Sequence, residues 1–167
     1  MLREIATRRS VRRYTAEPIK KEALTELLHA AMNAPSAMDR RPWRLLVVTD
    51  RAALDHIAEM HPFAGMVRQA QAAVLVSCDM DEANNREHGY LDCGAAIENL
   101  LLEATHQGLG ACWCGMSPAQ DRVDAFAEYF SLPKSYVPMG LVALGHPGEE
   151  KPQEDRYREK DVTWWNA

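Results

Sequence analysis

The spacing of hydrophobic residues changes repeatedly along the chain, and this change predicts helices separated by short strands. Apolar residues three and four apart are typical of amphipathic helices, whereas short apolar and β-branched runs are typical of buried strands. Helices are expected over about 20–33, from Asp50 onward, over about 90–107 and after Ser117. Strands are expected over about 43–49, 72–78, 109–115 and 138–145. This predicts an α+β or α/β sandwich with helices on both faces of one sheet.

Several residues predict where these elements begin and end. Asp50 is expected to cap the helix that follows it. Ser117, with Pro118 and Gln120, fits an N-terminal capping box, and Gly108 fits a helix C-cap. The polar stretch 79–89 is expected to be a loop.

The last segment of the chain has a different character. Residues 146–167 are polar and contain prolines, yet they end near two tryptophans, Trp164 and Trp165. Such a segment has no core of its own. We therefore expect a C-terminal arm of about residues 150–167 that packs on another surface.

Length and composition indicate one globular domain over residues 1–167. The chain has 167 residues, 47% of them hydrophobic and 26% charged. A chain of this size buries roughly 70% of its extended surface around one core. No internal repeat is visible.

Charge and cysteine usage narrow the cellular setting. The first residues are charged where a signal peptide needs an apolar region, and no apolar run is long enough to span a membrane. We therefore expect a cytoplasmic protein with no membrane partner. Its four cysteines are expected to be thiols. The formal net charge of -5 and the pI near 5.7 argue against nucleic-acid binding.

Four arginines lie within six residues in the stretch RRSVRR, residues 8–13. Arginine binds phosphate well because its planar guanidinium donates two parallel hydrogen bonds and stays charged, and a serine hydroxyl adds a donor. If the segment is extended, Arg8, Ser10 and Arg12 share one side. The alternative is an ordinary solvated basic face.

Two further segments are candidates for ligand contacts. In NAPSAMDRRPW, residues 33–43, small residues and prolines form a loop directly before a strand, although the stretch read by itself favours a simple helix stop followed by a strand start. In GLGACWCG, residues 108–115, Gly115 could present a backbone N–H to a ligand. Cys112 and Cys114 share one strand face, at a spacing marginal for a disulfide.

Taken in this order, these motifs resemble the nitroreductase family of FMN-dependent oxidoreductases, and specifically its short members. The matching stretches are RRSVRRY, APSAMDRRPW, AAIENLLLEATHQGLGACWCG and ALGHPGEEKPQEDR. They extend from residue 8 to about residue 156. The resemblance implies a nitroreductase-like α+β fold with a mixed, mainly antiparallel sheet, and a homodimer that exchanges its C-terminal segments.

The resemblance also implies which residues contact FMN. The residues that hold the FMN phosphate and ribityl chain in this family correspond to Arg8, Arg9, Ser10, Arg12 and Arg156. The loop residues Pro35, Ser36, Ala37, Asp39 and Arg41 correspond to a segment that reaches the flavin from the other subunit. Backbone groups of Trp113, Cys114 and Gly115 correspond to those near the flavin N5 edge. Asp39 and Arg41 replace the family's usual Asn and Gln, and Glu98 stands where Gln is common.

The function implied is reduction of FMN by NAD(P)H, followed by transfer to a nitroaromatic, a quinone or a similar small acceptor in a ping-pong mechanism. The flavin carries this chemistry, so no catalytic acid or base is expected. Loop 79–89 and Tyr90 are candidate pocket walls. Alternatives are another reaction on the same fold, such as dehalogenation or dehydrogenation, or a flavin-binding sensory protein. A metal site at His88, Asp92 and Cys93 is disfavoured because this ligand set has no recognised spacing.

Overall fold

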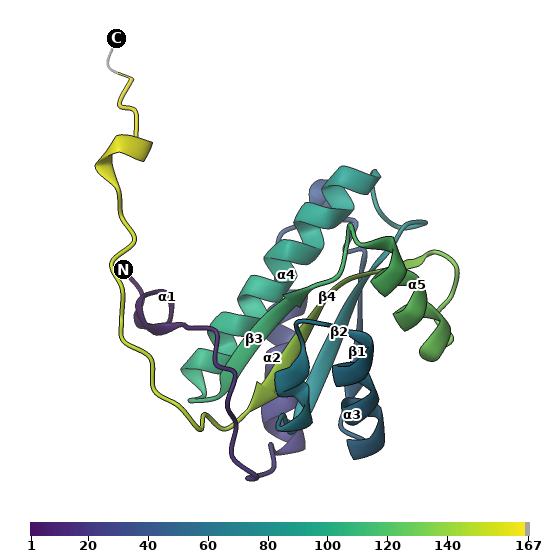
Figure 1. Cartoon of the computed structure of the whole chain (residues 1–167). Coiled ribbons are helices and arrows are strands. Elements are labelled where there is room, and N and C mark those ends of the chain that lie inside the picture. The colour runs from purple at the N-terminus through teal and green to yellow at the C-terminus, as the bar shows by residue number, and fades with distance from the viewer. Residues whose placement is uncertain (166–167) are drawn as a thin grey trace.

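A four-stranded antiparallel sheet forms the centre of the computed structural model, which describes residues 1–165 (Figure 1). Its strands follow the spatial order β1-β2-β4-β3. They are β1 (Trp43–Val48), β2 (Ala72–Asp79), β3 (Gly110–Gly115) and β4 (Tyr136–Gly145). A single parallel bridge, between Ser10 and Ala111, adds to the edge of β3. The predicted α+β architecture is confirmed.

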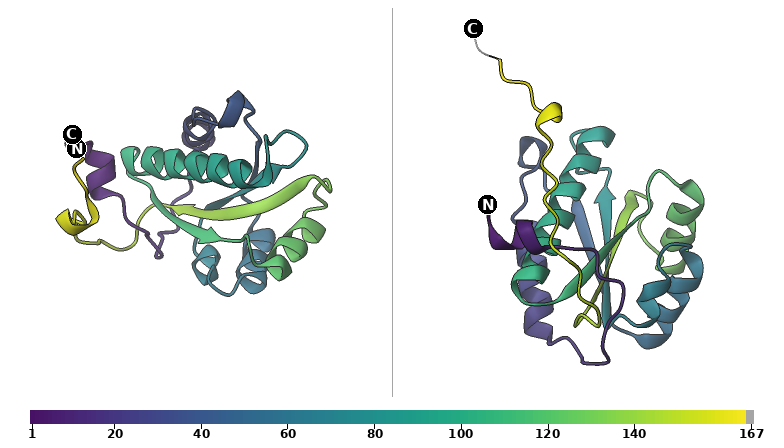
Figure 2. Two further views of the ribbon diagram at one scale, coloured as in Figure 1. Left: turned by 90° about the horizontal axis from the view of Figure 1, so that it is seen from above. Right: turned by 60° about the vertical axis from the view of Figure 1, so that its left-hand side comes forward.

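Helices cover both faces of the sheet, as the view from above shows (Figure 2). The α-helices are α1 (Arg3–Thr7), α2 (Lys21–Met32), α3 (Arg51–Met60), α4 (Arg86–His106) and α5 (Gln120–Tyr129). The short 3₁₀ helices are η1 (Ala37–Asp39), η2 (Gly65–Arg68) and η3 (Glu159–Asp161). One apolar core lies between the sheet and α2 with α4, and a second lies between the sheet and α3, η2 and α5. All eight residues of β2 are therefore buried.

Two of the predicted helix ends are confirmed. The Asp50 side chain accepts a hydrogen bond from the Ala53 N–H and so caps α3. Gly108 follows the end of α4 with φ of 74°. The N–H groups of Gly108 and Leu109 donate to the carbonyls of Thr105 and Ala104. This is the Schellman arrangement, and its left-handed residue favours glycine.

Two local predictions are wrong, and one short helix was not predicted. The loop expected over 79–89 is shorter, because the Asn85 side chain accepts from the His88 N–H and starts α4 at Arg86. Ser117 does not cap α5. The Ala119 N–H donates to the Met116 carbonyl and closes a turn that contains Ser117. Helix α5 therefore begins after this turn, at Gln120. Helix α1 was not expected, since it has five residues and none of them is buried.

The segment after β4 leaves the body of the protein and passes α1 as an extended arm (Figure 1). Its residues from 150 to 165 are exposed, including Trp164 at 78% and Trp165 at 90%. The described part of the arm, up to Trp165, is thus exposed in the single chain, and its packing on another surface stays a prediction. Asn166 and Ala167 lie outside the described residues. Nowhere in the described part of the chain does a helix have the length and apolarity needed to cross a membrane.

Candidate functional site

Strand β3 has one open edge, and this edge organises the site. The other edge pairs with β4. On the open edge the Val11 N–H donates to the Ala111 carbonyl over 3.0 Å. Because backbone groups of a strand point to alternate edges, the N–H and C=O of Trp113 and the N–H of Gly115 point to the same side, while the Gly115 carbonyl accepts hydrogen bonds from His61 and Arg122. Residues 10 and 11 cover this edge only at Ala111, near the start of β3. The backbone groups of Trp113 on the same edge are left uncovered by this segment.

A groove of about 300 Å³ lies beside this edge, between β3 and the first half of α4. Its walls are formed by Tyr90, Gly94, Ile97, Trp113, Gly115, Ser117, Pro118 and Met139. Trp113 as a whole residue is 42% exposed, and its indole lies toward β4. The indole passes over Gly140, where an added Cβ would collide with it. Tyr90 therefore lines the groove as predicted, whereas loop 79–89 does not contribute to it.

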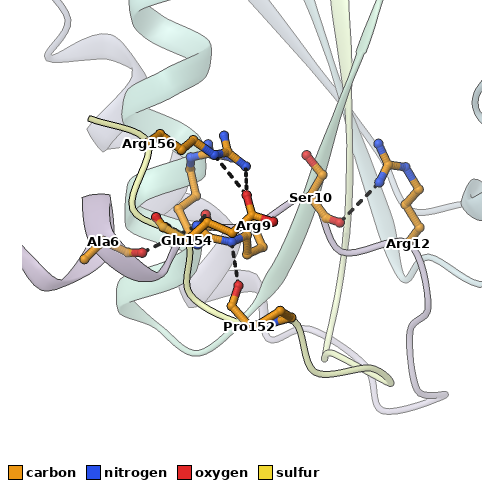
Figure 3. A network of polar contacts seen from close by, with 8 residues as sticks. Ala6, Arg9, Ser10, Arg12, Pro152, Glu154 and Arg156 are labelled. Atoms are coloured by element: carbon orange, nitrogen blue, oxygen red, sulfur yellow. Dashed lines mark hydrogen bonds and ion pairs between the residues drawn. The ribbon is translucent and has the colours of Figure 1, made fainter. Parts of the chain in front are cut away.

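The arginines of the N-terminal segment meet the beginning of the arm near the start of β3 (Figure 3). The Arg9 guanidinium donates to the Pro152 carbonyl over 2.9 Å. Arg12 donates to the Ser10 carbonyl over 3.4 Å. Arg156 pairs with Glu154 over 3.0 Å. We call Arg8, Arg9, Ser10, Arg12 and Arg156 the basic cluster.

The expected alternation of side chains in this cluster is wrong. Arg8 reaches α4, where its Nε lies 3.2 Å from a carboxylate oxygen of Glu98. Ser10 and Arg12 lie instead near Cys112 on the other face of β3. The segment makes only one bridge to β3, at Ser10, so it is too short and irregular to behave as a regular strand.

The carboxylates beside the basic cluster hold it only weakly. Glu98 and Glu154 pair with Arg8 and Arg156, with side chains 45% and 55% exposed. Glu149 accepts from the Arg12 backbone N–H over 2.6 Å, which helps to lower the pKa of Glu149. Exposed ion pairs contribute only about 0.2–1 kcal/mol. An incoming dianion can therefore replace them at small cost.

The loop after α2, residues 35–41, is tightly constrained. Met38, Asp39 and Arg41 all adopt left-handed conformations, with φ of 55°, 53° and 51°. The Arg41 guanidinium donates two hydrogen bonds of 2.7 Å to the Asp39 carboxylate. The hydrogen bonds from Arg41 lower the pKa of Asp39. The Ser36 hydroxyl accepts a hydrogen bond from the Arg41 N–H over 3.0 Å. Arg41 is therefore held by both Ser36 and Asp39.

Asp92 of α4 anchors this loop, a role that the sequence did not reveal. Its Oδ1 accepts from the Ala37 N–H over 3.0 Å, and the residue is 6% exposed. Its Oδ2 is buried, and among residues 1–165 it has no hydrogen-bond partner. The sequence signal that could have indicated this role is the position of Asp92 among the buried, mainly apolar residues of α4. No hydrogen bond or ion pair found within the described residues joins loop 35–41 to the basic cluster.

His61 supports the end of β3 and was also missed. It is 1% exposed. Its Nδ1 accepts from the Phe63 N–H over 3.2 Å, so Nε2 carries the proton and donates to the Gly115 carbonyl over 3.0 Å. Burial lowers the pKa of His61, which keeps the ring neutral. Arg122 donates to the same carbonyl over 3.2 Å. A single histidine before a proline gives no recognisable sequence signal.

The residues of the disfavoured metal site do not converge. His88 is exposed and bonds with Asn84 and Asn85, while the Cys93 thiol is buried and faces the Ser77 carbonyl. No group of three His, Cys, Asp or Glu side chains suited to a metal occurs within residues 1–165.

The antiparallel sheet, its two helical layers and the basic cluster at an open strand edge define the class of fold, and comparison with known proteins identifies the family. The nitroreductase family model matches residues 5–63 and 58–146. The chain belongs to the nitroreductase family.

Individual relatives agree with this assignment. A protein of Methanothermobacter thermautotrophicus with the provisional name NADH dehydrogenase/NAD(P)H nitroreductase is 39% identical over 157 residues, which are 94% of this chain and 82% of the relative. A crystal structure with the same provisional name from Parabacteroides distasonis is 37% identical, with a TM-score of 0.93 over 98% of this chain and 96% of that one. A nitroreductase-like structure from Desulfovibrio desulfuricans, described in complex with FMN, is 30% identical, with a TM-score of 0.85 over 98% of this chain and 95% of that one.

Proposed function

We propose that this protein is an FMN-dependent oxidoreductase that accepts hydride from NAD(P)H and reduces a small acceptor, such as a nitroaromatic or a quinone. The observation that carries the proposal is the basic cluster at the start of the open edge of β3, with the apolar groove at the other end of the same strand. One relative has NAD(P)H nitroreductase in its name, which supports NAD(P)H as the reductant. Another relative was solved in complex with FMN, which supports FMN as the cofactor.

The residues present fit FMN. The phosphate carries about -1.5 to -2 charges, and the basic cluster offers guanidinium donors held only by exposed carboxylates and backbone carbonyls. Arg8, Ser10, Arg12 and Arg156 would hold the phosphate and ribityl chain. Arg9 would mainly fix the arm, because its guanidinium already donates to Pro152. The open backbone edge at Trp113, with Cys114 and Gly115, would face the ring system.

When bound, the flavin supplies the hydride-transfer chemistry, and the chain supplies position and environment. His61 and Arg122 both donate to the Gly115 carbonyl, so the end of β3 would be rigid beside the bound cofactor. Trp113, Ile97 and Met139 give the groove apolar walls that exclude water from the reacting faces. One groove of this size suits alternate occupation by nicotinamide and acceptor, which is the basis of a ping-pong mechanism.

The complete site belongs to a homodimer in this proposal. A loop anchored to Asp92 contains Pro35, Ser36, Ala37, Asp39 and Arg41, whereas Arg8 of the basic cluster reaches Glu98, which lies further along α4. A second copy would bring its loop to the flavin of the first. The exposed tryptophans of the arm are suited to hold the two copies together, since large aromatic side chains are frequent interface anchors. A cytoplasmic location, expected from the charged N-terminal residues, also remains a proposal.

Flavin content and initial-rate kinetics test the function together. The purified protein should show the visible absorbance of bound flavin and oxidise NADH or NADPH in the presence of a quinone or nitroaromatic. Double-reciprocal plots at several acceptor concentrations should be parallel. Bound flavin without any nicotinamide oxidation would instead indicate a sensory protein, and intersecting lines would exclude the shared groove.

A further inference from the structure

The apolar groove between β3 and α4 has a polar pair of side chains at its helical wall. Tyr90 lines the groove, and the residues that line it within the described chain are all uncharged. The Arg86 Nε donates to the Tyr90 hydroxyl oxygen over 2.7 Å, from one turn earlier on α4. The guanidinium carbon of Arg86 lies 5.5 Å from the centre of the Tyr90 ring. Arg86 is exposed, so it lies at the rim of the groove, beyond Tyr90.

Both side chains keep hydrogen-bond donors that the rest of the described chain does not use. A guanidinium has five N–H donors, and within residues 1–165 the Arg86 side chain bonds with Tyr90 alone and forms no ion pair. The Tyr90 hydroxyl oxygen accepts from Arg86, and its own proton has no acceptor in the same part of the chain. An oxygen atom of a ligand in the groove can therefore receive hydrogen bonds from both residues.

The rest of the groove suits an aromatic ring. Trp113, Ile97 and Met139 give it apolar walls, and Tyr90 adds a second aromatic side chain. Aromatic rings pack favourably against indole and phenol rings in offset or edge-to-face arrangements. The groove volume of about 300 Å³ is at the lower end of the range for small-molecule sites. The groove is therefore suited to a molecule with a single ring.

An apolar ring site beside two free donors, one of them cationic, fits an aromatic ring with an anionic substituent. Guanidinium groups bind carboxylates well because the hydrogen bonds between them are charge-assisted. We propose that Arg86 and Tyr90 select acceptors that carry a carboxylate on the aromatic ring. This inference rests on the proposed function, because the acceptor must enter the same groove. With a nitro compound, each turnover oxidises one NAD(P)H to NAD(P)⁺, takes up one proton and reduces the nitro group to a nitroso group with release of one water.

The carboxylates near Arg86 in the sequence leave its guanidinium available. Glu82 and Glu87 are exposed, and neither forms an ion pair with Arg86. Arg68 offers a contrast, because its guanidinium lies 3.7 Å from a carboxylate oxygen of Glu59. Arg68 belongs to η2, which packs on the opposite face of the sheet from α4. Replacing either arginine with glutamine changes the net charge equally, so Arg68 is a matched control for Arg86.

Two acceptors of nearly equal shape test the proposal. The ratio of kcat/KM for para-nitrobenzoate to kcat/KM for para-nitrobenzamide is measured in each protein, so that the intrinsic reactivities of the two compounds cancel between proteins. We expect Arg86→Gln to lower this ratio by about three- to fivefold, near the upper limit for an exposed ion pair. Tyr90→Phe should lower the ratio as well, and Arg68→Gln should leave it as in the parent. The difference between the parent and Arg86→Gln should shrink as salt is added.

Binding of unreactive analogues separates this inference from the proposed function. Titration calorimetry of the purified proteins with benzoate and with benzamide needs no turnover. The parent should bind benzoate more tightly than benzamide, and Arg86→Gln should lose this preference. An unchanged ratio in Arg86→Gln or Tyr90→Phe, or an equal fall in Arg68→Gln, would overturn the inference. If neither nitro compound were reduced, the proposed function would be contradicted, and the calorimetric preference alone would then decide the inference.

Discussion

The basic cluster and loop 35–41 differ in how much of a binding site each offers alone. The cluster holds cationic donors against exposed carboxylates that a phosphate can displace. The loop is already rigid, with three left-handed residues, an internal ion pair and an anchor at Asp92. The basic cluster thus supplies positive charge for a phosphate, and loop 35–41 supplies a rigid surface. No hydrogen bond or ion pair within residues 1–165 joins the two, and the proposal that a second copy completes the site is what the following predictions test.

The largest expected effect comes from separating the two copies. Deleting residues 161–167 removes Trp164 and Trp165, whose side chains are largely exposed in the single chain and are the proposed anchors. Dimer content and flavin occupancy should fall together in sedimentation experiments with absorbance detection of the flavin. A truncated monomer with full flavin content would show that the loop of a second copy is not needed.

A smaller effect is expected from releasing the loop. Asp92→Ala removes the acceptor of the Ala37 N–H and should destabilise the protein by about 1–3 kcal/mol, the range for leaving a buried donor unsatisfied. Flavin binding should weaken as well, because the loop loses its anchor. Urea unfolding and flavin titration measure the two effects. Asp81→Ala, at an exposed position, is the control and should alter neither.

The ion pair between Asp39 and Arg41 should affect the reduction potential of the bound flavin and should not affect how tightly the flavin is bound. The negative charge of Asp39 disfavours an anionic reduced flavin, and Arg41 offsets it through two hydrogen bonds. Arg41→Gln should therefore lower the flavin reduction potential and Asp39→Asn should raise it. Because the two side chains are hydrogen-bonded to each other, the shift of the double variant should differ from the sum of the two single shifts. Potentiometric titration of the four proteins measures this, and strictly additive shifts would show that the pair is not coupled.

The smallest effect concerns the carboxylate that faces the basic cluster. Glu98 pairs with Arg8 and competes with the proposed phosphate for the same guanidinium. Glu98→Gln should tighten FMN binding a fewfold at most, because an exposed ion pair is worth about 0.2–1 kcal/mol. The gain should shrink as salt is added. Weaker FMN binding in this variant would mean that Glu98 positions Arg8 and does not compete with the ligand.

The sequence predicted the architecture well because its signals are local and strong. The apolar runs of β1, β2 and β4, the Asp50 cap and the Gly108 turn each appear in the structure where the pattern placed them. Helix α1 escaped prediction because it buries no side chain and so leaves no apolar pattern. Ser117 misled because a capping motif does not show whether the chain turns before the helix begins.

The candidate site was less predictable because it depends on contacts between distant residues. The arginines were conspicuous as a group. The partners of Arg8 and Arg9 are Glu98 and Pro152, however, and their positions follow from the fold. His61 lies 54 residues before Gly115, and Asp92 lies 55 residues after Ala37. Single polar residues at such separations carry no periodic signal.

The most direct test of the account compares FMN with riboflavin, which lacks the phosphate, in fluorescence titrations of the parent, Arg12→Ala and Arg13→Ala proteins. A charge-assisted hydrogen bond is worth about 1.5–3 kcal/mol, so the parent should bind FMN at least about tenfold more tightly than riboflavin. Arg12→Ala should lose most of this preference. Arg13→Ala, an equally exposed neighbour outside the basic cluster, should keep it. Equal affinity of the parent for FMN and riboflavin would contradict the assignment of the basic cluster as the phosphate site.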